Sequence, residues 1–135
     1  MKVFLDTNIW LSGRFRPGLC AELLDALVEI DATLLLDERV LEEFTRIARD
    51  KLKVDEPVLE RTAFFFHHYA VVVPSANEPV GGIPDPDDAW ILAAALYAQA
   101  ELFVTGDKPL LALGTVEGLP LVDPRTAYSY VRGLV

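Results

Sequence analysis

The chain has 135 residues, which is the size of one domain and too short to divide comfortably into two. Hydrophobic residues make up 52% of it, enough for a full core, so intrinsic disorder is excluded. The formal net charge of −9 argues against a protein that coats DNA non-specifically, because such binding depends on neutralising phosphates. The same charge leaves room for bound cations or a basic partner.

No segment approaches the roughly 20 apolar residues that a membrane span needs, because charges interrupt every stretch. The N-terminal residues MKVFLDTNIWL do not read as a signal peptide, since Asp6 interrupts the apolar run and no small-residue cleavage site follows. Cys20 is the only cysteine, so neither a disulfide framework nor a cysteine-based metal site is expected. We expect a cytoplasmic protein without membrane association that forms one domain over residues 1–135.

Hydrophobic periodicity and turn residues predict strands and helices in alternation. Strands are predicted at Lys2–Leu5, Thr33–Leu36, Ala70–Val73, Leu102–Thr105 and Leu119–Val122. Helices are predicted from Leu19 to Val28, from Asp37 to Leu52, from Asp55 to Tyr69, from Asp85 to Leu96 and from Pro124 onwards. Two segments, around Arg14–Gly18 and at Pro74–Pro84, are predicted to be loops.

Strands separated by helices indicate βαβ units with right-handed crossovers. The predicted fold class is therefore α/β, a three-layer sandwich with a central, mostly parallel sheet flanked by helices. In folds of this kind, ligands bind beyond the carboxyl ends of the strands. This rule directs attention to the polar residues that follow each strand.

Four acidic residues occupy positions that converge in this arrangement. Asp6 directly follows the first strand, and Asp107 lies two residues beyond the strand that ends at Thr105. Asp88 lies in the first turn of its helix, and Glu43 lies about two turns into the Asp37 helix. The start of the Asp88 helix faces the same edge of the sheet as the strand ends, and Glu43 could reach inward over the sheet, so the four carboxylates are expected to meet there.

Clustered carboxylates raise one another's pKa values and destabilise a fold unless a cation neutralises them. Hard cations such as Mg²⁺ or Mn²⁺ prefer oxygen ligands of this kind. The chemistry that suits such a site is in-line attack of a metal-activated water on a phosphodiester. The sequence therefore predicts a metal-dependent hydrolase that acts on phosphodiesters.

The same segments resemble a known family. VFLDTN (Val3–Asn8), LEEF (Leu41–Phe44), DDAWILAAA (Asp87–Ala95) and LFVTGD (Leu102–Asp107) are similar, in order and spacing, to the four motifs of PIN-domain ribonucleases. With the flanking helices, the resemblance covers almost the whole chain. It implies a PIN-like fold and RNA cleavage that depends on Mg²⁺ or Mn²⁺. The branch most resembled is the VapC-type toxins of toxin–antitoxin pairs, which implies frequent homodimerisation and inhibition by an antitoxin protein.

The resemblance also implies roles for individual residues. The acidic positions of the family, which are both catalytic and metal-binding, correspond to Asp6, Glu43, Asp88 and Asp107. The supporting positions correspond to Thr7, Asn8 and Thr105. Glu42 stays open as a rival to Glu43, which is preferred because the family's glutamate precedes an apolar residue. Asp85 and Asp87 crowd near Asp88, which fits best because the small and apolar residues of its helix follow it in phase.

Several other polar and aromatic residues have weaker claims to a function. Arg14 and Arg16 follow the first strand and are candidates for contacts with substrate phosphate, although solvated loop arginines are commoner. His67 and His68 follow three phenylalanines and are interpreted as packing or interface residues rather than metal ligands. Their helix is a candidate contact with a second copy or an antitoxin. Trp90 and Tyr97, seven residues apart on one helical face, are expected to pack.

Two alternative functions remain open at this stage. A phosphatase of the haloacid-dehalogenase type also uses an aspartate after the first strand. That chemistry needs a second aspartate two positions later for proton transfer, where this chain has Asn8. A non-catalytic PIN-like module that binds RNA or protein is the other alternative, and the complete acidic set argues against it.

Overall fold

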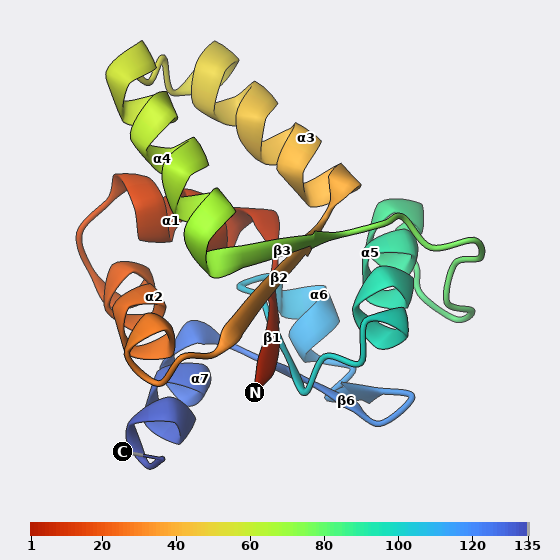
Figure 1. Cartoon of the computed structure of the whole chain (residues 1–135). Helices are drawn as coiled ribbons and strands as arrows, with labels where there is room; N and C mark the ends of the chain where they lie inside the picture. The colour runs from red at the N-terminus through yellow and green to blue at the C-terminus, as the bar shows by residue number, and fades with distance from the viewer. Residues whose placement is uncertain (135) are drawn as a thin grey trace.

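The computed structural model describes residues 1–134, which form a six-stranded sheet with helices on both sides (Figure 1). The strands are β1 (Lys2–Leu5), β2 (Thr33–Asp37), β3 (Ala70–Val73), β4 (Leu102–Val104), β5 (Thr115–Val116) and β6 (Leu119–Val122). The helices are α1 (Thr7–Phe15), α2 (Leu19–Glu29), α3 (Glu38–Arg46), the π-helical turn η1 (Ile47–Lys51), α4 (Glu56–Tyr69), α5 (Pro86–Tyr97), α6 (Lys108–Leu111) and α7 (Pro124–Arg132).

The sheet is parallel except at one edge, and its strand order is β3-β2-β1-β4-β6-β5. Only β5 is antiparallel, to its neighbour β6. The chain builds one half of the sheet outward from β1 to β3 and then returns to place β4 against β1. The order therefore reverses between β1 and β4, where Leu5 pairs with Val104, and open α/β sheets bind ligands beyond the strand ends at such a point.

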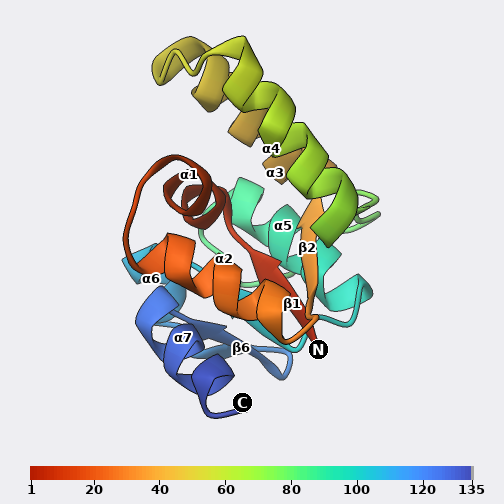
Figure 2. The same ribbon diagram turned by 60° about the vertical axis from the view of Figure 1, so that its left-hand side comes forward.

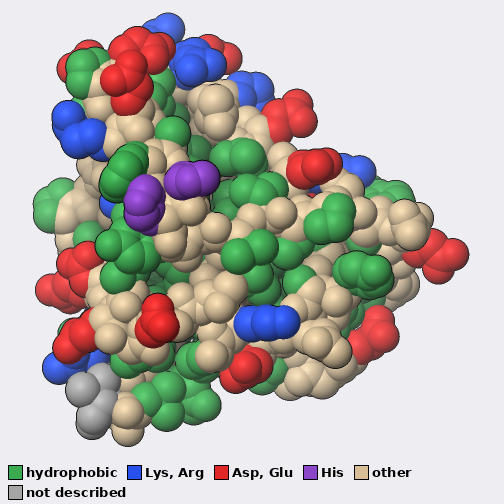
Figure 3. Space-filling view, in the orientation of Figure 1, with side chains coloured by type: hydrophobic (Ala, Val, Ile, Leu, Met, Phe, Trp, Pro, Cys, Tyr) green, Lys and Arg blue, Asp and Glu red, His purple; other side chains and the backbone are tan. Residues whose placement is uncertain are grey.

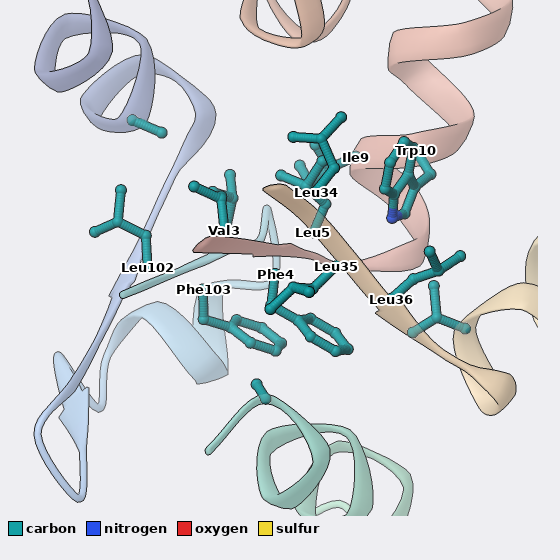
Figure 4. Packing of buried hydrophobic residues seen from close by; sticks show 14 of the residues in the cluster. Val3, Phe4, Leu5, Ile9, Trp10, Leu34, Leu35, Leu36, Leu102 and Phe103 are labelled. Carbon is teal, nitrogen blue, oxygen red and sulfur yellow. The ribbon is translucent and has the colours of Figure 1, made fainter. Parts of the chain in front are cut away.

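Helices cover both faces of the sheet, as the three-layer prediction requires. Figures 1 and 2 show α1, α2 and α7 on one face and α5 on the other. Side chains alternate accordingly (Figure 4): Phe4 and Phe103 point toward α5, stacked with ring centroids 5.3 Å apart, while Val3 points toward the opposite layer. The predicted fold class is confirmed, and none of the helices in residues 1–134 is both long and apolar enough to cross a membrane.

Helices α3 and α4 form a hairpin that extends beyond one end of the sheet (Figure 2). Its base is fixed by aromatic rings around the fully buried Trp10 of α1. The Phe66 ring lies edge-on to Trp10 with centroids 4.9 Å apart and edge-on to Phe44 with centroids 5.1 Å apart. These contacts tie α3, and the acidic residues that it carries, to the helix that begins at the end of β1.

Several elements differ from the sequence-based prediction. The segment after the first strand is helical over Thr7–Phe15, where no helix was predicted, because Gly13 interrupts its apolar pattern. A β-carbon on Gly13 would lie 2.5 Å from Leu24 Cδ1 and 3.2 Å from the Cys20 carbonyl oxygen, so glycine permits α1 to pack against α2. The short elements α6 and β5 were also missed. Tyr97 is 80% exposed, so the expectation that it packs is wrong.

Candidate active site

A pocket of about 540 Å³ opens where β1 and β4 end. Its walls come from the loops and helix starts that follow these strands, together with one side chain from α3. The lining residues are Asp6, Thr7, Asn8, Ile9, Ser12, Cys20, Glu43, Asp85, Asp87, Asp88, Ile91, Gly106, Asp107 and Pro124. All four acidic residues predicted from the sequence are therefore brought to one pocket, from four different segments of the chain.

Asp6 is held in a fixed orientation at the end of β1. Its backbone N–H still bonds to the Val104 carbonyl oxygen at 3.0 Å, so the residue continues the sheet. One carboxylate oxygen accepts from the Thr7 backbone N–H at 2.8 Å, and the other accepts from the Thr105 hydroxyl at 2.8 Å. Burial raises the pKa of Asp6, and the nearby charges of Glu43 and Asp107 raise it further, while the two hydrogen bonds oppose the rise.

Thr105 joins the two halves of the site. Its side chain is fully buried directly after β4. The hydroxyl donates to Asp6 and accepts from the Asp107 backbone N–H at 3.1 Å. One threonine side chain therefore fixes the ends of two adjacent strands and both of the aspartates that follow them.

Asp88 enters the pocket from the start of α5. Of the three neighbouring aspartates, Asp85 caps the helix by accepting from the Asp87 backbone N–H at 2.9 Å. Asp87 is largely exposed and lies 3.9 Å from an Arg39 guanidinium nitrogen. Partial burial raises the pKa of Asp88 to about 6, with further contributions from the charges of Asp85, Asp6 and Asp107. Asp88 is thus the member of this trio whose carboxylate interacts most strongly with the pocket.

Glu42 and Glu43 are adjacent on α3, but their side chains point in different directions from the helix. Glu43 lines the acidic pocket and contributes to the raised pKa of Asp6. Glu42 does not line this pocket and instead lines two neighbouring hollows along α3, one of which it shares with Glu43. This geometry favours Glu43 as the glutamate that belongs with the three aspartates.

The supporting residues lie where the motifs suggest, whereas the arginines do not. Thr7 and Asn8 line the pocket, and the Thr7 hydroxyl is buried without a hydrogen-bond partner in residues 1–134. Arg14 lies with its guanidinium 4.2 Å from the Phe65 ring centroid, and Arg16 is exposed at the end of α1. Neither arginine lines the pocket, so the sequence-based suggestion that they contact substrate there finds no support in the geometry.

The two histidines are remote from this chemistry. Both are exposed near the end of α4, and Figure 3 shows them on the surface beside hydrophobic side chains. The His68 ring stacks on Phe64 with centroids 4.0 Å apart, and its Nδ1 lies 3.1 Å from the Phe64 carbonyl oxygen. Neither histidine lines the acidic pocket, in keeping with their interpretation as packing or surface residues.

The pocket fits a hard cation by its chemistry rather than by a preformed coordination shell. Its ionisable lining groups near Asp6 are carboxylates, and the orphaned Thr7 hydroxyl adds another oxygen. Yet nowhere in residues 1–134 do three or more histidine, cysteine, aspartate or glutamate side chains lie close enough together to hold a metal ion. In this arrangement fewer than three of these side chains would hold a cation directly, and the cation would keep several of its waters, as Mg²⁺ commonly does.

Some lining residues could not be identified by reasoning from the sequence. Ser12, Ile9 and Cys20 come from α1 and α2, and Ile91 and Pro124 complete the wall. Ser12 lies four residues after Asn8, so the spacing would have placed it on the same face if α1 had been predicted. The others are apolar or weakly polar residues without a chemical signature.

Comparison with known proteins agrees with this description. The model of the PIN domain family matches residues 2–109, which is most of the chain. The chain therefore belongs to the PIN-domain family. PIN domains are generally nucleases that use divalent metal ions.

Two solved structures share the fold. One is the crystal structure of VapBC2 from Rickettsia felis bound to a DNA fragment from their promoter, with 19% identity, a TM-score of 0.63, and coverage of 91% of this chain and 98% of that chain. The other is the crystal structure of PAE2754 from Pyrobaculum aerophilum, with 16% identity, a TM-score of 0.62, and coverage of 98% of this chain and 90% of that chain. No curated protein matches the sequence.

Proposed function

We propose that this protein is a metal-dependent endoribonuclease that hydrolyses RNA phosphodiester bonds. The observation that carries the proposal is the convergence of Asp6, Glu43, Asp88 and Asp107 on one pocket at the switch point of the sheet. Membership of the PIN-domain family supports nuclease chemistry, and the oxygen-rich lining supports Mg²⁺ or Mn²⁺ as the cofactor. Residues 1–135 would act as one nuclease domain.

The four carboxylates would hold the cation, and their own environment explains why they need it. Burial, and to a lesser degree the charges of the neighbouring carboxylates, raise the pKa values of Asp6 and Asp88, so both groups are ionised at a cost. A bound divalent cation supplies an activated water and stabilises charge on the phosphoryl and leaving oxygens. Thr105 orients Asp6 by a hydrogen bond and holds the Asp107 backbone, so it is a positioning residue.

The biological context that we propose is that of a toxin in a toxin–antitoxin pair. The resemblance of the motifs to VapC-type toxins supports this role, and the shared fold with a chain of VapBC2 is consistent with it. The implied partners are RNA as substrate, an antitoxin protein and a second copy of the chain, in the cytoplasm. Expression without the antitoxin should arrest growth, and a co-encoded small protein should restore it. Normal growth with demonstrably active protein would count against the toxin role.

The decisive experiment for the nuclease compares Asp6→Asn with Asp31→Asn. Asp31 lies in the exposed turn between α2 and β2, and its positive φ of 58° is one that asparagine also adopts. With Mg²⁺ or Mn²⁺ present, we expect Asp6→Asn to lose at least 100-fold in the rate of RNA cleavage, while Asp31→Asn cleaves like the wild type. Equal cleavage by both variants, or cleavage unaffected by a chelator, would overturn the proposal and favour a non-catalytic role.

A further inference from the structure

A second, smaller hollow of about 180 Å³ adjoins the acidic pocket. It is lined by Arg39, Glu42, Glu43, Arg46, Asp87 and Ile91. Three of these residues, Glu43, Asp87 and Ile91, also line the acidic pocket, so the two cavities share part of their walls and lie side by side. Within residues 1–134, Arg39 and Arg46 are the only cationic side chains that line either of them.

The two arginines are placed by the periodicity of α3. Arg39, Glu43 and Arg46 follow one another at spacings of four and three residues, so they lie on one stripe of the helix. The arginines therefore flank Glu43, one turn before it and one turn after it. At 1.5 Å of rise per residue, their α-carbons are about 10 Å apart along the helix axis.

Neither guanidinium is strongly engaged within the protein. Arg39 lies 3.9 Å from Asp87, whose side chain is 83% exposed, and its guanidinium carbon lies 5.0 Å from the Trp90 ring centroid. An exposed ion pair of this length stabilises a fold little. Arg46 is exposed and makes no ion pair within the described residues, whereas Arg49 on the same hairpin pairs with Glu56.

An acidic pocket in a chain with a net charge of −9 repels a polyanion, so a nucleic-acid substrate needs cations close to the reaction site. Guanidinium groups bind phosphate oxygens through two parallel N–H donors, which gives both attraction and orientation. The hollow offers two such groups directly beside the pocket that the four carboxylates line. No other cation lines either cavity in residues 1–134.

We propose that Arg39 and Arg46 form a phosphate-binding subsite that holds the RNA backbone beside the phosphodiester bound in the acidic pocket. This inference rests on the proposed nuclease function and assigns a phosphate contact for which Arg14 and Arg16 were only weak candidates from the sequence. The ligand is the backbone phosphate of a neighbouring nucleotide, so recognition is independent of base sequence. Binding of RNA displaces the Arg39–Asp87 pair and leaves Asp87 at the rim.

The test measures RNA binding and RNA cleavage separately. Binding of a single-stranded RNA oligonucleotide is measured against salt concentration in an Asp6→Asn background, which prevents turnover. We compare Arg39→Gln/Arg46→Gln with the matched control Arg49→Gln/Arg61→Gln, which makes the same charge change on the α3–α4 hairpin. None of the control residues lines either cavity.

We expect the Arg39→Gln/Arg46→Gln variant to bind RNA at least 10-fold more weakly. Its slope of log affinity against log salt should fall by about 1.4, which is about 0.7 for each lost contact with a single strand. The control pair should change affinity by less than about threefold, and Arg39→Lys/Arg46→Lys should recover most of the loss. In otherwise wild-type protein, the two glutamines should raise KM and leave kcat nearly unchanged.

Equal binding by the glutamine pair and the control pair, with equal salt slopes, would overturn the subsite. Thermal unfolding of each variant verifies that it is folded, and the lysine pair gives a second reading if the glutamine pair is destabilised. Metal-dependent cleavage with an unaltered KM in the glutamine variant would overturn the subsite alone. Arginine-dependent binding without any cleavage by the wild type would overturn the nuclease function alone.

Discussion

At the scale of single residues, the site stores unfavourable electrostatic energy. Partial burial and neighbouring carboxylates raise the pKa of Asp88 to about 6. At neutral pH the carboxylate is therefore ionised in an environment that opposes its ionisation. Asp6 experiences the same opposition, chiefly from burial. Residues kept under such conditions destabilise the protein unless a ligand compensates, which is typical of functional sites.

Replacing Asp88 with asparagine should therefore stabilise the metal-free protein at neutral pH. The folded state binds the Asp88 proton more tightly than the unfolded state does, so the ionised group destabilises the fold above pH 6. This penalty disappears as the pH falls from 6 toward the ordinary value of 3.8. Because the side chain is partly exposed and screened, we expect a gain on the order of 1 kcal/mol at pH 7.5.

Chemical denaturation between pH 4 and pH 8 measures this effect. Asp123→Asn is the control, and we expect it to lose stability at neutral pH where Asp88→Asn gains it. Hydrogen bonding by the Thr126 backbone N–H lowers the pKa of Asp123, which caps α7. Its ionised form therefore stabilises the fold at neutral pH, and the contribution is lost as the pH falls through the lowered pKa. A loss of stability in Asp88→Asn at pH 7.5 would contradict this account of the site.

The residues of the site differ in how well the sequence alone predicts them. Asp6 and Asp107 could be placed because a strand end fixes both their position and their direction. Glu43 and Glu42 could not be separated on the same basis, since adjacent helical residues differ by about 100° in direction and only packing fixes the rotation of α3. The position of Arg14 could not be inferred from the sequence, because its stacking on Phe65 of α4 depends on a contact between distant segments.

At the scale of secondary-structure elements, the start of α3 deserves a test because α3 carries Glu43 and both arginines. Asp37 ends β2, is fully buried and caps α3, with one carboxylate oxygen accepting from the Val40 backbone N–H at 2.9 Å. The other carboxylate oxygen has no partner within residues 1–134. Burial is the largest influence on Asp37 and raises its pKa. The residue therefore combines a favourable cap with an unfavourable buried charge.

Two variants distinguish the favourable cap from the unfavourable buried charge. Asp37→Ala removes the cap, and we expect it to destabilise α3 by about 1 kcal/mol and to reduce RNA cleavage by displacing Glu43. Asp37→Asn keeps an acceptor for the Val40 N–H and removes the charge, so it should be at least as stable as the wild type at pH values where the Asp37 carboxylate is ionised. Urea unfolding and cleavage rates provide the measurements. If asparagine destabilises as much as alanine, the buried charge has a role that this geometry does not explain.

Elements with strong periodicity were predicted correctly, and those without it were not. The strands β1, β2 and β4 and the helices α2 and α5 contain apolar runs that are largely buried, so burial explains their type. Strand β3 was predicted from its β-branched run, although Val71 and Val72 are exposed. Helix α1 has a glycine where α2 approaches closely, and β5 contains only two residues. Such features depend on tertiary contacts and the geometry of a turn, which a single sequence does not state.

At the scale of the whole molecule, the topology explains why carboxylates from distant parts of the chain gather in one pocket. The reversal of strand order between β1 and β4 leaves their carboxyl ends uncovered by a crossover, and the segments that follow both strands carry aspartates. Helix α3 of the α3–α4 hairpin adds Glu43, and the start of α5 adds Asp88. The strand order itself was not part of the sequence-based prediction, although the gathering of the carboxylates was.

This arrangement links metal binding to stability and to pH. A cation that binds only the folded state raises the free energy of unfolding by about 2.7 kcal/mol at 100 times its dissociation constant. For a chain of this size, we expect that gain to raise Tm by roughly 8–13 °C. Because carboxylates must be ionised to bind a cation, the increase should be larger at pH 7.5 than at pH 5.5, below the pKa of about 6 of Asp88.

Thermal unfolding with and without Mg²⁺ or Mn²⁺ at both pH values measures this linkage. Asp88→Asn should be more stable than the wild type without metal and should gain less from it, so the order of Tm values should reverse at saturating metal. Asp31→Asn should follow the wild type throughout, because it lies in the turn before β2, away from the pocket. A Tm that does not respond to either cation at pH 7.5 would mean that the four carboxylates do not form a metal site. The reversal would identify the electrostatic cost of burying and clustering the carboxylates as the energy that metal binding relieves.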